Sequence, residues 1–157
     1  MSDTHGRHLA ARAAMALFQR RGAGHVIHCG DVGGIAVFDE LLSLPCAFVW
    51  GNTDEPDRST LAYLEGAGLR APSEPPARLT LDGKSIAVFH GHERAFASTI
   101  RAGGFDYLLH GHSHEARDER IGAMRIINPG ALQRARVKTV ATLDTATDEL
   151  TFHEINA

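Results

Sequence analysis

The sequence has few cysteines and no long apolar run. Its 157 residues include only two cysteines, Cys29 and Cys46, which are too few for a disulfide framework and suit a reducing compartment. No run of about 18 apolar residues is present, so we expect no membrane-spanning helix. No basic stretch followed by an apolar one is visible at the start, so we expect no secretory signal. These features predict a cytoplasmic protein.

Lysine is scarce, whereas histidine is abundant. Ten histidines accompany only two lysines, Lys84 and Lys138. The net charge is −3 and the arginines are scattered, so there is no strong signal for a nucleic-acid partner. The sequence does not settle whether the chain forms a homo-oligomer. Since histidine is the commonest metal ligand and a frequent proton carrier, its excess calls for a structural or chemical explanation.

Helical and strand patterns alternate along the chain. The helical patterns cover His8–Arg21, Gly34–Leu44, Asp57–Gly66 and Glu93–Ala102. The strand patterns cover His25–Cys29, Cys46–Trp50, Leu79–Leu81, Ser85–Phe89 and Tyr107–His110, then Arg117–Arg120, Met124–Asn128, Val137–Leu143 and Glu149–Glu154. The proline-rich stretch Ala71–Pro76 is predicted to be a loop inside one domain that spans residues 1–157. The alternation predicts an α/β domain, and the β-rich C-terminal half predicts a second sheet packed on the first.

Short polar segments that contain Asp, Asn or His follow the apolar strands. They are Asp3-Thr4-His5-Gly6, Gly30-Asp31, Gly51-Asn52-Thr53-Asp54, His90-Gly91-His92 and Gly111-His112-Ser113-His114. Open α/β sheets bind ligands beyond the carboxyl ends of their strands, so these segments are expected to meet in one crevice. The Asp-x-His and His-x-His spacings place alternate side chains on the same side of an extended backbone. The sequence therefore predicts a metal site with clustered Asp and His ligands.

The mixture of imidazole and carboxylate groups narrows the chemistry. Such ligands suit Mn, Fe, Zn, Co or Ni better than Ca or Mg. Asp31 has two carboxylate oxygens and could bridge two ions. Ions about 3.5–4 Å apart stabilise the attacking and leaving oxygens of an in-line displacement and lower the pKa of a bridging water. This is the chemistry of phosphoester hydrolysis.

With these motifs in this order, the whole chain resembles the calcineurin-like metallophosphoesterase superfamily, and within it the small YfcE-type phosphodiesterases. The resemblance implies a four-layer α/β/β/α sandwich of two mixed sheets flanked by helices, with two divalent ions at one sheet edge. Manganese is the first candidate, with Ni, Zn, Fe or Co as alternatives. The implied ligands of one ion are Asp3, His5, Asp31 and His114, and those of the other are Asp31, Asn52, His90 and His112.

The implied activity is hydrolysis of small phosphodiesters, or of monoesters, by a hydroxide that bridges the metal ions. Asp31, Asn52 and Asp54 are the predicted catalytic residues. Asn52, His92 and Arg134 are the predicted substrate contacts, with capping of the helix at Glu93 as the alternative for His92. Many relatives have histidine where this chain has Asp54, and a carboxylate is a poor proton donor at neutral pH. We therefore expect either a preference for good leaving groups or a metal-bound water that acts as the acid. The rival hypothesis is a protein-binding scaffold on the same fold, such as the retromer subunit.

The start of the sequence departs from the family pattern. Relatives begin with an apolar strand that leads into the Asp-x-His motif, whereas here only Met1 and Ser2 precede Asp3. Without that strand, neighbouring strands would expose unpaired backbone groups, and Asp3 and His5 would lie on a frayed terminus. We therefore expect that the true start lies upstream, that the chain is truncated, or that the first metal site is weakened, and we favour the upstream start. The remaining histidines, His8, His25, His28 and His153, are expected to be structural, and His110 is left open between the core and the surroundings of the site.

Overall fold

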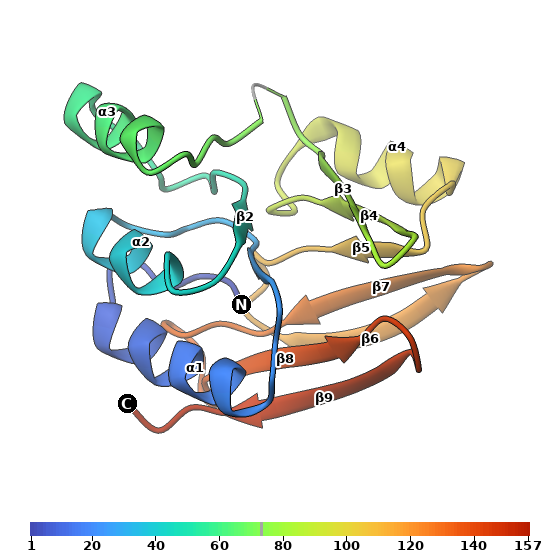
Figure 1. The fold of residues 1–157 in the computed structure, drawn as a ribbon. Helices are drawn as coiled ribbons and strands as arrows, with labels where there is room; N and C mark the ends of the chain where they lie inside the picture. The colour runs from blue at the N-terminus through green and yellow to red at the C-terminus, as the bar shows by residue number, and fades with distance from the viewer. Residues whose placement is uncertain (73) are drawn as a thin grey trace.

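The computed structural model describes residues 1–72 and 74–157, so Ser73, within the predicted Ala71–Pro76 loop, lies outside the described residues. The helices and strands follow the order α1 (His8–Arg20), β1 (Val26–His28), α2 (Ile35–Leu41), β2 (Cys46–Phe48), α3 (Arg58–Gly66), β3 (Ala77–Leu81), β4 (Lys84–Val88), α4 (Arg94–Ala102), β5 (Tyr107–Leu109), β6 (Ala116–Ile121), β7 (Met124–Pro129), β8 (Thr139–Asp144) and β9 (Glu149–Glu154) (Figure 1). None of the described helices has the length and apolar character needed to cross a membrane.

The described strands form one mixed sheet and two smaller sheets. The five-stranded sheet has the order β3-β4-β5-β7-β6, in which β4, β5 and β7 run parallel and the outer strands β3 and β6 run antiparallel to their neighbours. β1 and β2 form a parallel pair, and β8 and β9 form an antiparallel pair. Because β1, β2, β4 and β5 each lead into a predicted polar segment, the carboxyl ends of these strands carry the candidate site.

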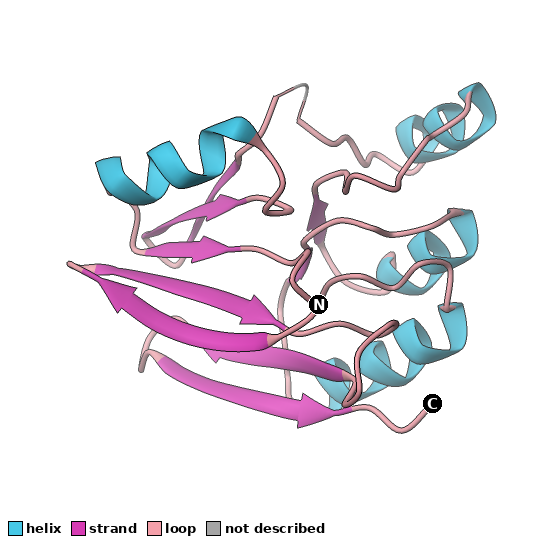
Figure 2. Ribbon diagram, turned by 180° about the vertical axis from the view of Figure 1, so that it is seen from behind, coloured by secondary structure: helices cyan, strands magenta, loops and turns pink. Residues whose placement is uncertain are grey.

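Layers of the fold are separated by three clusters of buried apolar side chains. One cluster lies where α1 and α2 pack on β1, β2 and β8, and includes Phe18, Phe38 and Phe48. The second lies between the sheets and joins Cys29 to the five-stranded sheet, and the third packs α4 on the other face of that sheet. Figure 1 and Figure 2 show α1, α2 and α3 on one side of the molecule and α4 on the opposite side, with the strands between them. This arrangement is the predicted α/β/β/α sandwich.

The alternation of side chains along the strands builds these layers. In β4, Ile86 and Val88 point into the cluster between the sheets. Their neighbours Ala87 and Phe89 point to the opposite face, where they meet α4. A strand covered on both faces is expected to be continuously apolar, as the segment Ile86–Phe89 is.

The first residues of the chain are anchored rather than frayed. The Met1 carbonyl accepts from Cys29 N–H at 3.0 Å, and Asp3 N–H donates to the Gly30 carbonyl at 3.0 Å. On the other side, the Ser2 carbonyl accepts from Leu132 N–H at 3.3 Å. Met1, Ser2 and Asp3 are all buried, so the expectation that Asp3 lies on a loose terminus was wrong. Backbone pairing on both sides holds this residue in place.

No strand precedes α1 in the described part of the chain, and a cavity of about 640 Å³ lies beside Met1. Its walls include Ile27 of β1 and Leu143 and Leu150 of the β8–β9 pair. The cavity separates β1 from β8, so the sheet on the α1 side consists of two separate pairs of strands.

Candidate metal centre

The predicted polar segments meet at one edge of the molecule, and the backbone is strained there. Five of the predicted ligands have a left-handed backbone, with φ of 53° at Asp3, 44° at His5, 54° at Asp31, 68° at His112 and 59° at His114. Residues other than glycine rarely adopt this conformation, and it persists only where the surrounding structure imposes it. Concentrated strain of this kind is typical of functional sites.

Asp3, His5, Asp31 and His114 form a compact group. Each offers a ligand atom, and these atoms all lie within 4.8 Å of one another. His5 Nε2 lies 3.5 Å from Asp31 Oδ2, and His114 Nε2 lies 3.1 Å from Asp3 Oδ1. Asp3 Oδ1 and His5 Nε2 are buried yet make no hydrogen bond. Because unpartnered buried polar atoms are costly, these two atoms fit a cation bound between them.

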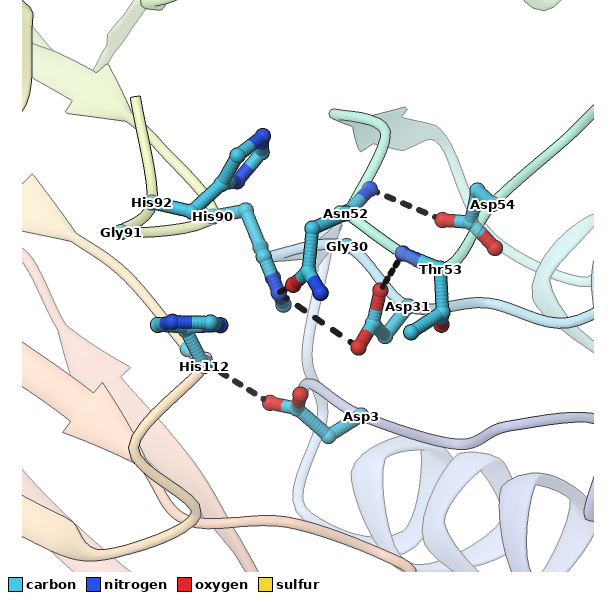
Figure 3. Close-up of polar contacts among 12 residues, drawn as sticks. Asp3, Gly30, Asp31, Asn52, Thr53, Asp54, His90, Gly91, His92 and His112 are labelled. Carbon is cyan, nitrogen blue, oxygen red and sulfur yellow. Dashed lines mark hydrogen bonds and ion pairs between the residues drawn. The ribbon is translucent and has the colours of Figure 1, made fainter. Parts of the chain in front are cut away.

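The second predicted group surrounds the same Asp31 carboxylate. His90 Nε2 lies 3.5 Å from Asp31 Oδ2 and 3.0 Å from Asn52 Oδ1 (Figure 3). The ring of His112 lies beside that of His90, with 5.0 Å between the ring centroids. The main-chain N–H of His112 donates to Asp3 Oδ2 at 3.1 Å, which ties this loop to the first group. The structure thus brings together all of the predicted ligands, with the second group the less compact.

Three of the four predicted histidine ligands share one orientation. His90 Nδ1 donates to the Cys29 carbonyl at 2.8 Å, and His114 Nδ1 lies 3.4 Å from the Arg134 carbonyl. His5 Nδ1 lies 3.4 Å from Thr53 Oγ1. With an oxygen at Nδ1, a neutral imidazole carries its lone pair on Nε2, which here faces the carboxylates. This is the arrangement expected of imidazoles that bind divalent transition metals.

Asp31 is held as a carboxylate at the centre of the site. Burial raises the pKa of Asp31. Hydrogen bonds from Thr53 and the nearby imidazoles of His90 and His5 lower it by a larger amount, so the pKa lies below its ordinary value. The Thr53 N–H donates to Asp31 Oδ1 at 2.9 Å and leaves Oδ2 facing the histidines. Burial lowers the pKa of His5, which favours the neutral imidazole that a metal requires.

Glycines allow the loops to approach one another closely. A Cβ at Gly51 would lie 2.1 Å from Asp31 Oδ1, and one at Gly111 would lie 2.6 Å from Asp3 Oδ2. Only glycine fits at these two positions, because any side chain there would displace a predicted ligand.

A model of the calcineurin-like phosphoesterase superfamily domain matches residues 1–148. The chain belongs to this superfamily. Phosphodiesterase MJ0936 of Methanocaldococcus jannaschii is 27% identical over an alignment of 154 residues that covers 95% of this chain and 93% of the relative. The solved structure of a novel archaeal phosphodiesterase has a TM-score of 0.87 at 26% identity and covers 99% of this chain and 97% of its own. The structure of YfcE, a phosphoesterase from E. coli, has a TM-score of 0.69 at 21% identity, with 99% and 97% covered.

Membership in the calcineurin-like phosphoesterase superfamily assigns the chain to the hydrolases of phosphoric esters. The family and fold class predicted from the motifs are confirmed, because both the family model and the archaeal structure cover nearly the whole chain. The superfamily also supports metal binding, which agrees with the compact group around Asp3 and Asp31.

Asp54, which the sequence placed among the catalytic residues, holds the loops of this phosphoesterase domain. Its carboxylate accepts from the main-chain N–H groups of Val32 at 3.1 Å, Gly33 at 2.9 Å and Gly51 at 2.9 Å. Figure 3 shows the Asp54 side chain on the far side of Thr53 from Asp31. These contacts connect the loop that carries Asp31 to the loop that carries Asn52, so the geometry favours a positioning role.

Glu93 plays a similar part at the histidine loop. Its carboxylate accepts from His90 N–H at 2.7 Å and Gly91 N–H at 2.6 Å. His92, a predicted substrate contact, has a side chain that is 37% exposed and lies 3.9 Å from the Glu93 carboxylate. Arg134, which the sequence also predicted to contact the substrate, is exposed and offers its carbonyl to His114.

Sequence reasoning missed two residues that support the ligands. Thr53 contacts both Asp31 and His5, and Glu93 fixes the His90 loop. The signal for Thr53 was its place between Asn52 and Asp54 in a predicted site segment. For Glu93 it was an acidic residue directly before a helix and three residues after a predicted ligand.

Proposed function

We propose that this chain is a phosphodiesterase that uses two divalent metal ions held on either side of Asp31. The observation that carries the proposal is the environment of a single oxygen atom. Asp31 Oδ2 lies 3.5 Å from His5 Nε2 and 3.5 Å from His90 Nε2, while Oδ1 is held by Thr53. One carboxylate oxygen that faces two histidine groups suits a bridging ligand between paired ions.

The proposed ligands follow from these contacts. Asp3, His5, Asp31 and His114 would hold one ion, and Asp31, Asn52, His90 and His112 would hold the other. Imidazole nitrogens with carboxylate and amide oxygens favour manganese as the resident metal, with Ni, Zn, Fe or Co able to replace it. When bound, paired divalent ions activate water as a nucleophile and stabilise the negative charge on the phosphoryl oxygens.

The protein's own groups orient the substrate around this centre. Asn52 is exposed at the rim, so its amide can reach both the metal site and a phosphoryl oxygen. His92 and Arg134 are also exposed and are proposed to contact the ester, with Arg134 supplying positive charge. Asp54 and Glu93 hold the loops through main-chain N–H groups. No described residue is placed as a dedicated proton donor, so the proposed substrates are small phosphodiesters with good leaving groups.

The similarity to MJ0936, which is named a phosphodiesterase, supports diester hydrolysis. Both cysteines are free and burial raises the pKa of each thiol to about 12, so they are unreactive and fit the proposed cytoplasmic location. A homo-oligomer is not required by this site, because the proposed ligands all come from one chain.

The test combines metal analysis with hydrolysis of bis(p-nitrophenyl) phosphate. Wild-type protein should bind two ions per chain and hydrolyse this diester with added Mn²⁺, and EDTA should abolish the activity. Asp31→Asn keeps an oxygen for Thr53 N–H but removes the bridging charge, so we expect kcat/KM to fall by at least about 100-fold, the scale of about 2.7 kcal/mol. Glu65→Gln, an exposed change on α3, is the matched control and should match wild type. Wild-type protein that binds no metal and hydrolyses no ester would overturn the proposal in favour of a scaffold.

A further inference from the structure

His28 lies behind the metal centre at the end of β1 and is fully buried. Gly30 N–H donates to its Nδ1 at 3.2 Å, so the ring proton lies on Nε2. Nε2 in turn lies 2.9 Å from Thr4 Oγ1 and donates to it. The Thr4 hydroxyl donates onward to the Val32 carbonyl at 2.9 Å. Both ring nitrogens are therefore engaged within the fold, and neither is available to a metal.

This chain of hydrogen bonds joins two loops that carry predicted ligands. Thr4 stands between Asp3 and His5, while Gly30 and Val32 flank Asp31. The same loops share main-chain hydrogen bonds, including His5 N–H to the Asp31 carbonyl at 2.9 Å. The His28 ring and the Thr4 hydroxyl add a side-chain connection across the pair.

The connection matters because the loops are strained. Asp3, His5 and Asp31 all have φ between 44° and 54°. Each such residue costs on the order of 1–3 kcal/mol and is retained only where neighbouring contacts hold it. Loss of one contact would let the loops relax, and the distance between His5 Nε2 and Asp31 Oδ2 would change.

We propose that His28, acting through Thr4, is a positioning residue that sets the spacing of the Asp3–His5 and Asp31 loops and thereby the metal affinity of the site. The inference rests on the proposed function, because it assigns His28 to the same centre. Groups behind metal ligands commonly change affinity by about 10–100-fold when they are removed.

The experiment measures the dissociation constant of Mn²⁺ by competition with a chromophoric chelator, at a temperature where every variant is folded. Thr4→Val and His28→Asn should each weaken Mn²⁺ binding by about 10–100-fold. Thr4→Ser, which keeps the hydroxyl, should stay within about threefold of wild type, clearly below the about 10–100-fold weakening of the other two variants. The double variant should bind Mn²⁺ no more weakly than the single variant with the lower affinity, because both changes break the same His28–Thr4 connection.

A second histidine–threonine pair provides the matched control. Thr142 Oγ1 lies 2.8 Å from His153 Nε2 in the β8–β9 pair, away from the predicted ligands. Thr142→Val should lower the thermal stability without changing the Mn²⁺ affinity. If Thr4→Val binds Mn²⁺ as tightly as the wild type does, and the wild type hydrolyses the diester, this inference is overturned and the proposed function stands. Weakened binding in Thr4→Val, with no hydrolysis by wild type, would support the inference and overturn the proposed function.

Discussion

The predicted histidine ligands differ in the oxygen atom that lies next to Nδ1. His90 and His114 face main-chain carbonyls, and His5 faces a threonine hydroxyl. The sequence predicted which histidines gather at the site, because their spacing follows strand ends. It could not predict the orientation of the rings, because Cys29 and Arg134 supply the carbonyls from distant parts of the chain. The sequence pattern therefore predicted which histidines lie close together, whereas the orientation of their rings follows only from the fold.

Asp54→Asn tests whether this residue positions loops or takes part in the chemical step. The amide keeps one acceptor oxygen but places an N–H₂ group against main-chain donors that now point at the carboxylate. We expect the free energy of unfolding to fall by about 1–3 kcal/mol, the cost of unsatisfied partly buried donors. Urea denaturation measures the change, and Glu55→Gln, an exposed neighbour, is the control. Unchanged stability with a large loss of kcat would instead assign Asp54 to the chemical step.

At the level of helices and strands, apolar periodicity located each element within a few residues. The predicted helix His8–Arg21 ends at Arg20, and the predicted strand Cys46–Trp50 ends at Phe48. Ends are hard to predict because the last residues form caps and loops whose partners come from other segments. For the same reason, the ion-pair network around Arg125 could not be predicted, because strand register rather than local sequence determines its partners.

Arg125→Met tests how this network joins neighbouring elements. Arg125 in β7 is mostly buried and pairs through two nitrogens with Asp118 of β6, each at 2.8 Å. It also pairs with Asp148, between β8 and β9, at 2.8 Å. Hydrogen bonds to Asp118 raise the pKa of Arg125, so the pair stays charged. We expect unfolding free energy to fall by about 1.5–3 kcal/mol, as for charged hydrogen bonds.

Chemical denaturation in low salt measures the effect of Arg125→Met. Arg101→Met, in the exposed last turn of α4, removes an equal charge and should change stability by no more than about 0.5 kcal/mol. Equal effects of the two substitutions would show that the network contributes nothing beyond surface charge.

At the scale of the whole molecule, the sequence predicted the order of the layers. It did not predict that the sheet on the α1 side is divided into the pairs β1–β2 and β8–β9. Alternation in strands such as β4 already assigns one face to each neighbouring layer. β1 and β8 do not pair, and the cavity beside Met1 lies between them, an arrangement that depends on how distant strands pack. The anchoring of Asp3 by Gly30 likewise comes from backbone pairing that no local pattern encodes.

The abundance of histidine makes the metal-free protein sensitive to acid. Burial lowers the pKa of His28 well below its ordinary 6.5, and burial also lowers the pKa of His110 and His5. The unfolded chain therefore binds more protons than the folded chain below about pH 6.5, and stability must fall as the pH drops through that value. Asp31, with a lowered pKa, adds stability above its ordinary 3.8 that is lost only at still lower pH.

We expect the urea midpoint of EDTA-treated protein to fall as the pH is lowered from 6.5 to 5, because the unfolded histidines take up protons in this range. Each such histidine contributes at most about 1.4 kcal/mol per pH unit. His28→Asn removes one of these groups and should reduce the pH dependence of the unfolding free energy by up to that amount. A wild-type midpoint that stays level down to pH 5 would show that the buried histidines are protonated equally in the folded and unfolded chains.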